Sequence, residues 1–277
     1  MSAPPQKNSD PLAGLFDRRS LLFLPASNPR AIAKARDSAA DMVILDLEDA
    51  VKAEDKDLAR DAAVEAVALA WPMPVAIRVN GVGSEWHSLD LDAVARSNAD
   101  YAVVPRAISA HLVKGVADVT GKPVLAMIET AAGVLAAAAI APTSAGLIAG
   151  TNDLAADLRL PSDAGRASLQ TALQTILLAA RAADVPAFDG VYNALDDESG
   201  LLAEATAGRL LGFDGKSLIH PNQIAPCNRA FAPSEAELDR ARRLVEAYDG
   251  GAERFDGAMV ERMHVEAARR LLERAAR

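Results

Sequence analysis

Residues 43–51 read VILDLEDAV, and this short stretch joins two opposite chemical characters. It begins as a buried strand should, with aliphatic residues in a row, and then runs into Asp46, Glu48 and Asp49. Ionised carboxylates resist burial unless they are paired or bound to a metal. The end of this predicted strand is therefore either in contact with solvent or at the edge of a site that uses negative charge.

The same alternation of a short apolar run and a stretch with helical spacing of apolar residues repeats along the chain. The β-rich runs are 20–25, 42–47, 75–79, 101–105, 124–128, 146–149, 186–188 and 217–219. Eight strands, each followed by helical sequence, predict an α/β fold of the TIM-like (β/α)8 barrel kind. An open doubly wound sheet is the alternative. The absence of a glycine-rich GxGxxG turn after the first strand favours the barrel.

The two ends of the chain differ from this repeat. Residues 1–17 are rich in Pro, Ser and Asn, which predicts a disordered leader. We expect the barrel to span residues 18–232. Residues 234–250 and 259–276 form two more helical segments joined by a Gly-rich polar link. A barrel does not need them, so residues 233–277 are predicted to be a helical extension that serves as a lid, an oligomer contact or both.

Composition excludes several classes of partner. The net charge is -9 and aromatic residues make up 4% of the chain, which argues against a nucleic-acid binder. No apolar run approaches the roughly 20 residues of a membrane span. Cys227 is the only cysteine, which rules out an intramolecular disulfide and fits a protein of the reducing cytoplasm.

Polar residues stand at or just beyond the carboxyl end of every predicted strand. They are Ser27, Glu48, Asp49, Arg78, Asn80, Arg106, Glu129, Thr130, Asn152, Asp153, Asp189 and His220. In barrel enzymes the active site is assembled at this face from the ends of several strands. The pattern therefore predicts where a site lies, but not its chemistry.

Two of these carboxylates, Glu129 and Asp153, follow neighbouring strands. Two carboxylates at one rim repel each other unless a cation lies between them, and oxygen ligands suit Mg2+. The alternative is that each acid caps the helix that follows it. The spacing alone does not decide between a metal site and helix caps.

Arg78 lies in an otherwise apolar strand and needs a partner, and its planar fork suits a carboxylate. It is either a ligand for a substrate carboxylate or one half of a structural ion pair with Glu48 or Asp49, and both roles are compatible. Arg106 either binds substrate or faces solvent.

Seven motifs occur in an order typical of one protein family. They are RRSLLFLPASNPR, VILDLEDAV, AIRVN, VVPR, AMIETAAGV, GTNDLAADL and GFDGKSLIHPNQI. Together they resemble the citrate lyase β-subunit-like branch of the HpcH/HpaI aldolase/citrate lyase family, over about residues 18–270. The resemblance implies a TIM-like barrel and a Mg2+-dependent carbon–carbon lyase. Its substrate would be a 3-hydroxyacyl thioester of CoA or an acyl carrier, of citryl, malyl or citramalyl type, cleaved through a metal-stabilised enolate.

By motif match, Glu129 and Asp153 fall on the family's metal ligands. Arg78 falls on the arginine that holds the substrate carboxylate and the enolate. Glu48 and Asp49 fall on the acidic pair beside the metal-bound waters, where either could act as the base. The same resemblance leaves open a malyl-CoA lyase, thioesterase or synthase-type activity, and a non-catalytic thioester-binding subunit.

The sequence departs from the branch in two places. After the fourth strand the branch often reads PK-x-E, whereas this chain has Arg106, the expected substrate-binding residue, and Ile108. In the tail, Glu261 stands where the branch usually has an aspartate that some members carry over a neighbouring subunit's active site. The resemblance thus implies a catalytic role for Glu261, a homo-oligomer with a trimer favoured, and partner subunits of the citrate lyase type.

Overall fold

The computed structural model describes residues 14–276. Its centre is a closed barrel of parallel strands in the order β1 to β8. The strands are β1 Ser20–Pro25, β2 Met42–Asp46, β3 Val75–Arg78, β4 Tyr101–Val104, β5 Val124–Ile128, β6 Gly146–Ala149, β7 Ala187–Asp189 and β8 Gly215–Leu218. The predicted (β/α)8 barrel is confirmed, and the open-sheet alternative is wrong because β8 pairs with β1.

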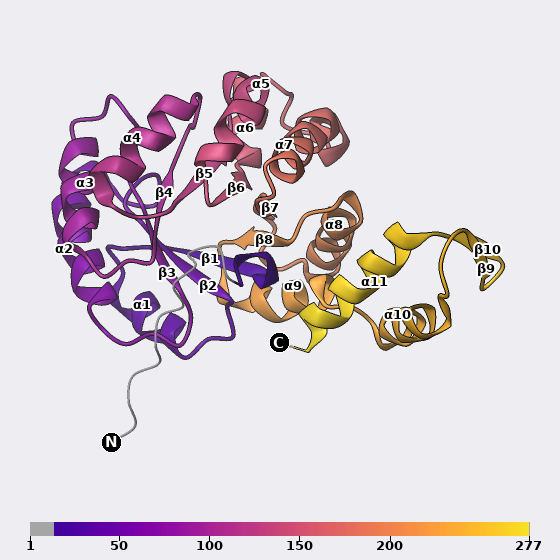
Figure 1. The fold of residues 1–277 in the computed structure, drawn as a ribbon. Helices are drawn as coiled ribbons and strands as arrows, with labels where there is room; N and C mark the ends of the chain where they lie inside the picture. The colour runs from indigo at the N-terminus through magenta and orange to yellow at the C-terminus, as the bar shows by residue number, and fades with distance from the viewer. Residues whose placement is uncertain (1–13, 277) are drawn as a thin grey trace. The chain divides into compact units, whose positions relative to one another are not determined.

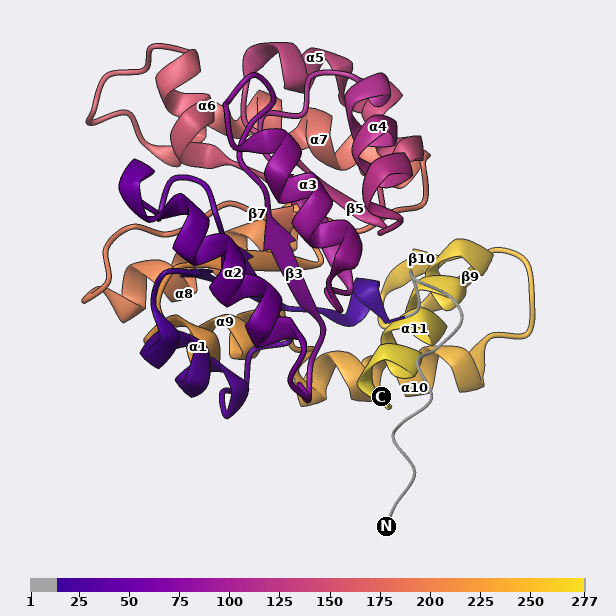
Figure 2. The same ribbon diagram turned by 90° about the vertical axis from the view of Figure 1, so that its left-hand side faces the viewer.

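Helices follow the strands and form the outer ring of the barrel (Figure 1). They are α1 Pro29–Arg36, α2 Lys56–Val67, α3 His87–Arg96, α4 Ala110–Thr120, α5 Ala131–Ile140, α6 Thr151–Asp157, α7 Gln170–Ala182, α8 Glu198–Leu211 and α9 Ile224–Phe231. Figure 2 shows α2 and α3 on the outer side of β3. Parallel strands are buried on both faces by this arrangement, which explains their nearly continuous apolar sequence.

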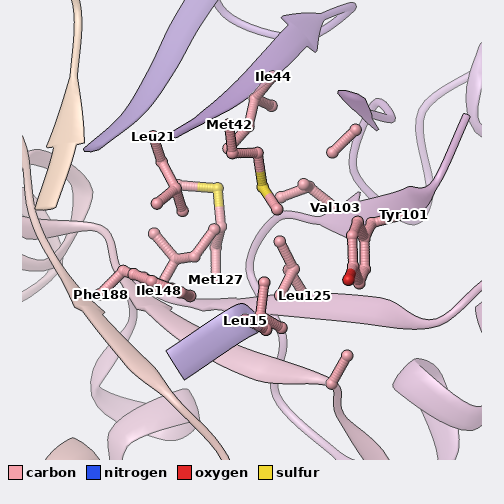
Figure 3. Close-up of a cluster of buried hydrophobic side chains, with 12 residues drawn as sticks. Leu15, Leu21, Met42, Ile44, Tyr101, Val103, Leu125, Met127, Ile148 and Phe188 are labelled. Carbon is pink, nitrogen blue, oxygen red and sulfur yellow. The ribbon is translucent and has the colours of Figure 1, made fainter. Parts of the chain in front are cut away.

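The interior of the barrel is a packed layer of apolar side chains. Leu21, Met42, Ile44, Leu125 and Phe188 come from four different strands and belong to one buried cluster, in which Figure 3 shows side chains from several strands meeting. Alternate residues of a strand face opposite sides of the sheet. The layer therefore closes the barrel below the strand ends and leaves the carboxyl ends of the strands to form a site.

The first described residues correct the predicted leader. Leu15–Asp17 form a short 3-10 helix, and Leu15 is 1% exposed within the barrel cluster. The Pro, Ser and Asn content predicts disorder up to residue 17, but Leu15–Asp17 are ordered. A single apolar anchor is enough to order the last residues of the leader. Residues 1–13 of the predicted leader lie outside the described residues.

The chain folds into two compact units, with a boundary between Ala230 and Phe231. The second unit contains α10 Glu235–Ala247, a hairpin of β9 Glu253–Phe255 and β10 Ala258–Val260, and α11 Arg262–Ala275. Leu244, Val260 and Val265 belong to its own small core. The predicted second helix began at residue 259, but residues 258–260 pair as a strand, so the Gly-rich link is part of a hairpin.

Among the helices of residues 14–276, none combines the length and the apolar character that crossing a membrane requires.

Candidate active site

Arg78 is held by a carboxylate directly beside it in the barrel wall. Asp46 and Arg78 are register partners at the ends of β2 and β3. The Arg78 Nε and Nη2 atoms each donate to one carboxylate oxygen of Asp46, both at 2.6 Å. Arg78 is 7% exposed and Asp46 1% exposed. A buried pair with this two-point geometry fixes the orientation of the guanidinium group.

The remaining Arg78 nitrogen, Nη1, is directed to the other acids. It lies 3.0 Å from Glu48 Oε2 and 3.7 Å from Asp49 Oδ2. Burial opposes the charge of Arg78, but the hydrogen bonds and charge of Asp46 outweigh it and raise the arginine pKa. The predicted ion pairs of Arg78 with Glu48 and Asp49 are present. The shortest contacts are to Asp46, a partner that the sequence reasoning missed although β2 and β3 are consecutive.

We call residues 46–50 the acidic loop, and two buried charges fix its backbone. Asp46 accepts hydrogen bonds from the backbone N–H groups of Glu48 and Ala50, at 2.9 and 3.0 Å. The Lys56 ammonium group, at the start of α2, donates to the carbonyl oxygens of Leu47 and Glu48, both at 2.7 Å. Carboxylates at the loop surface are therefore presented on a rigid support.

Glu129 and Asp153 follow β5 and β6, as predicted, and neither caps a helix. Thr130 is the N-cap of α5, and its hydroxyl accepts from Gly133 N. Gly150 is the N-cap of α6, whose start has no side-chain cap. Neither acid is therefore an N-cap, although Asp153 does lie in the first turn of α6, where a negative charge is favourable to the helix.

Arg106, just beyond β4, contacts both of these acids. Its backbone N–H donates to Glu129 Oε1 at 2.7 Å, and its Nη1 lies 3.9 Å from Asp153 Oδ1. Arg106 has φ 48°, a left-handed conformation that is uncommon for a residue with a side chain and clusters at functional sites. Its side chain is 56% exposed, so it is solvent-facing and available to a ligand.

These elements enclose a cavity of about 340 Å³ at the carboxyl ends of the strands. Its polar side chains include Asp46, Asp49, Arg78, Glu129 and Asp153. Its apolar side chains include Phe23, Met127, Val191 and Ile219. A concave site with a few converging polar groups on an apolar wall is typical of a small-molecule pocket.

The site contains more carboxylates than positive charges: Arg78 is the buried cation that faces Asp46, Glu48 and Asp49. Burial raises the pKa of Glu129 to about 7, and the nearby charge of Asp153 adds to the effect, while the N–H of Arg106 opposes it. Burial also raises the pKa of Glu48 to about 8, with Arg78 opposing and Asp49 adding. Glu129 lines the cavity, and a strongly perturbed carboxylate in a cleft is typical of a functional site.

The donor set fits Mg2+. Glu129 and Asp153 supply two carboxylates at one rim, and Mg2+ usually takes one or two protein carboxylates and keeps water or substrate at its other positions. Within residues 14–276, no group of three or more His, Cys, Asp or Glu side chains is arranged as metal ligands, so no all-protein cage competes. Gly150 makes room for Glu129, because a Cβ at this position would collide with the Glu129 side chain.

Asp189 does not face the cavity, and Glu261 belongs to the other unit of the chain. Asp189 pairs with Lys216 at 3.1 Å and Arg166 at 2.8 Å. Glu261 is the N-cap of α11, and its backbone N–H donates to His264 Nδ1 at 3.0 Å. Lys56 and Gly150 are contributors that the sequence reasoning did not name. The strand-end pattern does not include Lys56, because this residue lies at the start of helix α2.

Comparisons with known proteins agree with this geometry. The family model described as HpcH/HpaI aldolase/citrate lyase matches residues 19–221, and one described as a C–C bond lyase of the TIM-barrel fold matches residues 167–277. A (3S)-malyl-CoA thioesterase of Cereibacter sphaeroides is 44% identical over 93% of this chain and 94% of its own length. The citrate lyase subunit beta of Escherichia coli is 36% identical, with 93% of each chain covered.

A solved structure of a related protein has a similar fold. The protein CitE of Mycobacterium tuberculosis, crystallised with magnesium, acetoacetate and coenzyme A, superposes with a TM-score of 0.85. The two chains are 36% identical, and the match covers 94% of this chain and 98% of CitE. The barrel, the acidic cavity and the family model that spans most of the chain lead to one conclusion: this chain belongs to the HpcH/HpaI aldolase/citrate lyase family, a family of carbon–carbon lyases.

Proposed function

We propose that this chain catalyses the Mg2+-dependent cleavage of a carbon–carbon bond in a 3-hydroxyacyl-CoA thioester. The observation that carries the proposal is the placement of Glu129, Asp153 and Arg78 around one cavity, with the guanidinium group fixed by Asp46. The family membership and the magnesium and coenzyme A bound by CitE support the same reaction.

Glu129 and Asp153 would hold the metal ion. When bound, Mg2+ supplies Lewis-acid polarisation of a substrate oxygen and stabilises negative charge that develops there. The raised pKa of Glu129 follows from burial and from the proximity of a second carboxylate, and a divalent cation would remove both penalties.

Arg78 contributes a second positive charge. Breaking the bond between C2 and C3 leaves its electron pair in the thioester as an enolate, and C3 becomes the carbonyl carbon of the released oxo acid. The Arg78 Nη1 group is the part of the guanidinium that Asp46 does not occupy. A donor that is fixed before the charge develops stabilises the transition state without reorganisation.

A base must remove the proton of the 3-hydroxyl group. Asp49 lines the cavity, whereas Glu48 is not among the residues that line it, so Asp49 is the better placed of the two. The proton that Asp49 takes from the hydroxyl can be returned to C2 of the enolate, so the cleavage consumes no other reactant. Glu48 then acts through its contact with Arg78.

Two further residues complete the proposed site. Arg106 would bind the outer part of the substrate, because its exposed side chain lies next to Asp153. Glu261 would be supplied by a neighbouring copy in a homo-oligomer, as the family resemblance implies.

Thioester hydrolysis is the second candidate. It is favoured by one observation: the identity to a (3S)-malyl-CoA thioesterase is 44%, against 36% for the citrate lyase subunit beta. The name of the first relative also favours a CoA thioester over an acyl-carrier thioester as the substrate.

One assay separates the two reactions. The protein is incubated with Mg2+ and (3S)-malyl-CoA, and the products are identified by mass spectrometry. Carbon–carbon cleavage yields glyoxylate and acetyl-CoA, whereas hydrolysis yields malate and CoA. Citramalyl-CoA and citryl-CoA extend the panel. Turnover of none of these thioesters in the presence of Mg2+ would contradict the proposed function.

A further inference from the structure

Ser217 faces the interior of the barrel from β8. Its neighbour Lys216 points outward, where its ammonium group lies 2.7 Å from Glu204 of α8 and 3.1 Å from Asp189. Successive residues of a strand face opposite sides, so Ser217 faces inward. It lines the cavity that contains Arg78 and Glu129, and it is 1% exposed.

The hydroxyl of Ser217 has no hydrogen-bond partner among residues 14–276. Its surroundings on this side are apolar: its register partner on β1 is Leu21, and Phe23 and Ile219 line the cavity nearby. Burying a hydroxyl group without a hydrogen bond is unfavourable, because nothing offsets the loss of its hydration. Alanine would fill this position without that cost, so stability alone does not explain a serine here.

The position of Ser217 within the cavity indicates what could satisfy it. A substrate whose reacting oxygens lie at Arg78 and Glu129 must direct the rest of its acyl group at the remaining walls. Of the β1 and β8 side chains that line the cavity, only Ser217 can form a hydrogen bond. A group that is unsatisfied in the protein alone can be satisfied by a ligand oxygen, and such a group discriminates strongly between ligands with and without that oxygen.

We propose that Ser217 is a specificity-determining residue whose hydroxyl hydrogen-bonds an oxygen atom of the substrate's acyl group. The identity of the substrate as a 3-hydroxyacyl thioester rests on the proposed function. The hydrogen bond itself requires only a ligand with a polar oxygen on the β8 side of the cavity.

This role has an unusual signature, because activity and stability should change in opposite directions. Removing the hydroxyl removes an unsatisfied buried group, so Ser217→Ala should have a Tm equal to or above that of the wild type. The same variant should lose about 10- to 100-fold in kcat/KM for (3S)-malyl-CoA, the range expected for a hydrogen bond to a charged ligand group. Ser217→Thr keeps the hydroxyl and should retain most of the activity.

Ser144 provides a matched control. It is also a buried serine, but its hydroxyl is satisfied by the carbonyl oxygen of Ile140 at 3.0 Å, and it does not line the cavity. Ser144→Ala should therefore lower Tm and leave kcat/KM near the wild-type value. The experiment measures Tm and kcat/KM for the wild type, Ser217→Ala, Ser217→Thr and Ser144→Ala with Mg2+ present.

A second measurement keeps this inference separate from the proposed function. Acetoacetate, the ligand that CitE was crystallised with, is titrated into each protein with Mg2+, and its dissociation constant is measured by calorimetry. Weaker acetoacetate binding by Ser217→Ala than by Ser144→Ala supports the inference even if the wild type turns over no thioester, an outcome in which only the proposed function fails. The inference is overturned if Ser217→Ala loses Tm as Ser144→Ala does. It is also overturned if both kcat/KM and acetoacetate binding are unchanged in Ser217→Ala, or if the wild type shows neither turnover nor acetoacetate binding.

Discussion

Arg78 owes its orientation to Asp46, and this pair links the stability of the barrel to the chemistry of the cavity. Both side chains are almost completely buried, and two of the three guanidinium nitrogens are occupied by one carboxylate. Removing one member of such a pair leaves an uncompensated buried charge and typically costs about 3–5 kcal/mol. Substitutions that keep the charge but change the geometry are therefore more informative than deletions.

Arg78→Lys should lower kcat/KM by about 100-fold or more, the cost of losing one fixed donor at a developing negative charge. A lysine keeps the charge but cannot reach both oxygens of Asp46 and the cavity at once. Steady-state kinetics on the thioester panel measures the effect.

Arg19 gives the control for Arg78→Lys. It forms a similar two-point pair with Asp41, with Nε and Nη2 at 2.9 and 3.1 Å, just before β1 and outside the cavity. Arg19→Lys should reduce Tm and preserve kcat/KM. If Arg78→Lys also turned over at the wild-type rate, Arg78 would be a structural residue only.

Glu48 should make the metal-free protein less stable as pH rises. Its pKa is raised from 4.5 to about 8 in the folded protein, so between these values the folded state keeps a proton that the unfolded state has lost. Stability falls with pH wherever the folded state binds more protons. Glu48→Gln removes this contribution, so its Tm relative to wild type should increase as pH rises from about 5 to 8 in the presence of a chelator. A difference in Tm that stays constant over this range would show that Glu48 titrates normally.

At the scale of elements, the sequence predicts the barrel but not the contacts that hold the acidic loop in place. The strands were recognisable because each is an apolar run followed by helical spacing, and parallel strands buried on both faces have this pattern. The strand-end pattern therefore located Arg78, Glu129 and Asp153. It could not reveal Lys56, which reaches the acidic loop from α2, because that contact depends on tertiary packing. It also placed Asp189 at the site, whereas the outward position of that residue on β7 pairs it with Lys216.

Gly150 is the residue of the β6–α6 turn that should not tolerate a side chain. A Cβ there would collide with Glu129, while the φ of Gly150, -94°, is accessible to any residue. Gly150→Ala should therefore displace Glu129 and weaken Mg2+ binding by about tenfold or more, for a purely steric reason.

Gly115, within α4, is the matched control for Gly150→Ala. A Cβ at Gly115 meets nothing within 4 Å. Gly115→Ala should leave Mg2+ affinity unchanged and stabilise the protein by about 0.5–1 kcal/mol, because glycine is a poor helix former. Equal Mg2+ affinity in both variants would argue against Glu129 as a ligand.

For the whole molecule, we predict a homo-oligomer, with a trimer as the expected form, in which Glu261 acts in a neighbouring copy. Light scattering coupled to size-exclusion chromatography should give three times the chain mass. Mixing the impaired variants Arg78→Lys and Glu261→Gln after partial dissociation should raise the activity above that of either variant alone, because some sites would then have both wild-type residues. A monomeric mass, or mixtures without any recovered activity, would contradict this arrangement.

The most direct test of the account is calorimetric titration of Mg2+ into the wild type, Glu129→Gln, Asp153→Asn and Asp157→Asn. Asp157 is the control because it lies on the same helix as Asp153, but its carboxylate accepts the backbone N–H of Ala131 at 2.7 Å and does not line the cavity. We predict one Mg2+ per chain in the wild type and in Asp157→Asn, and loss of binding in Glu129→Gln and Asp153→Asn with the fold intact. An unchanged Mg2+ affinity in those two variants would contradict the assignment of the metal to this cavity.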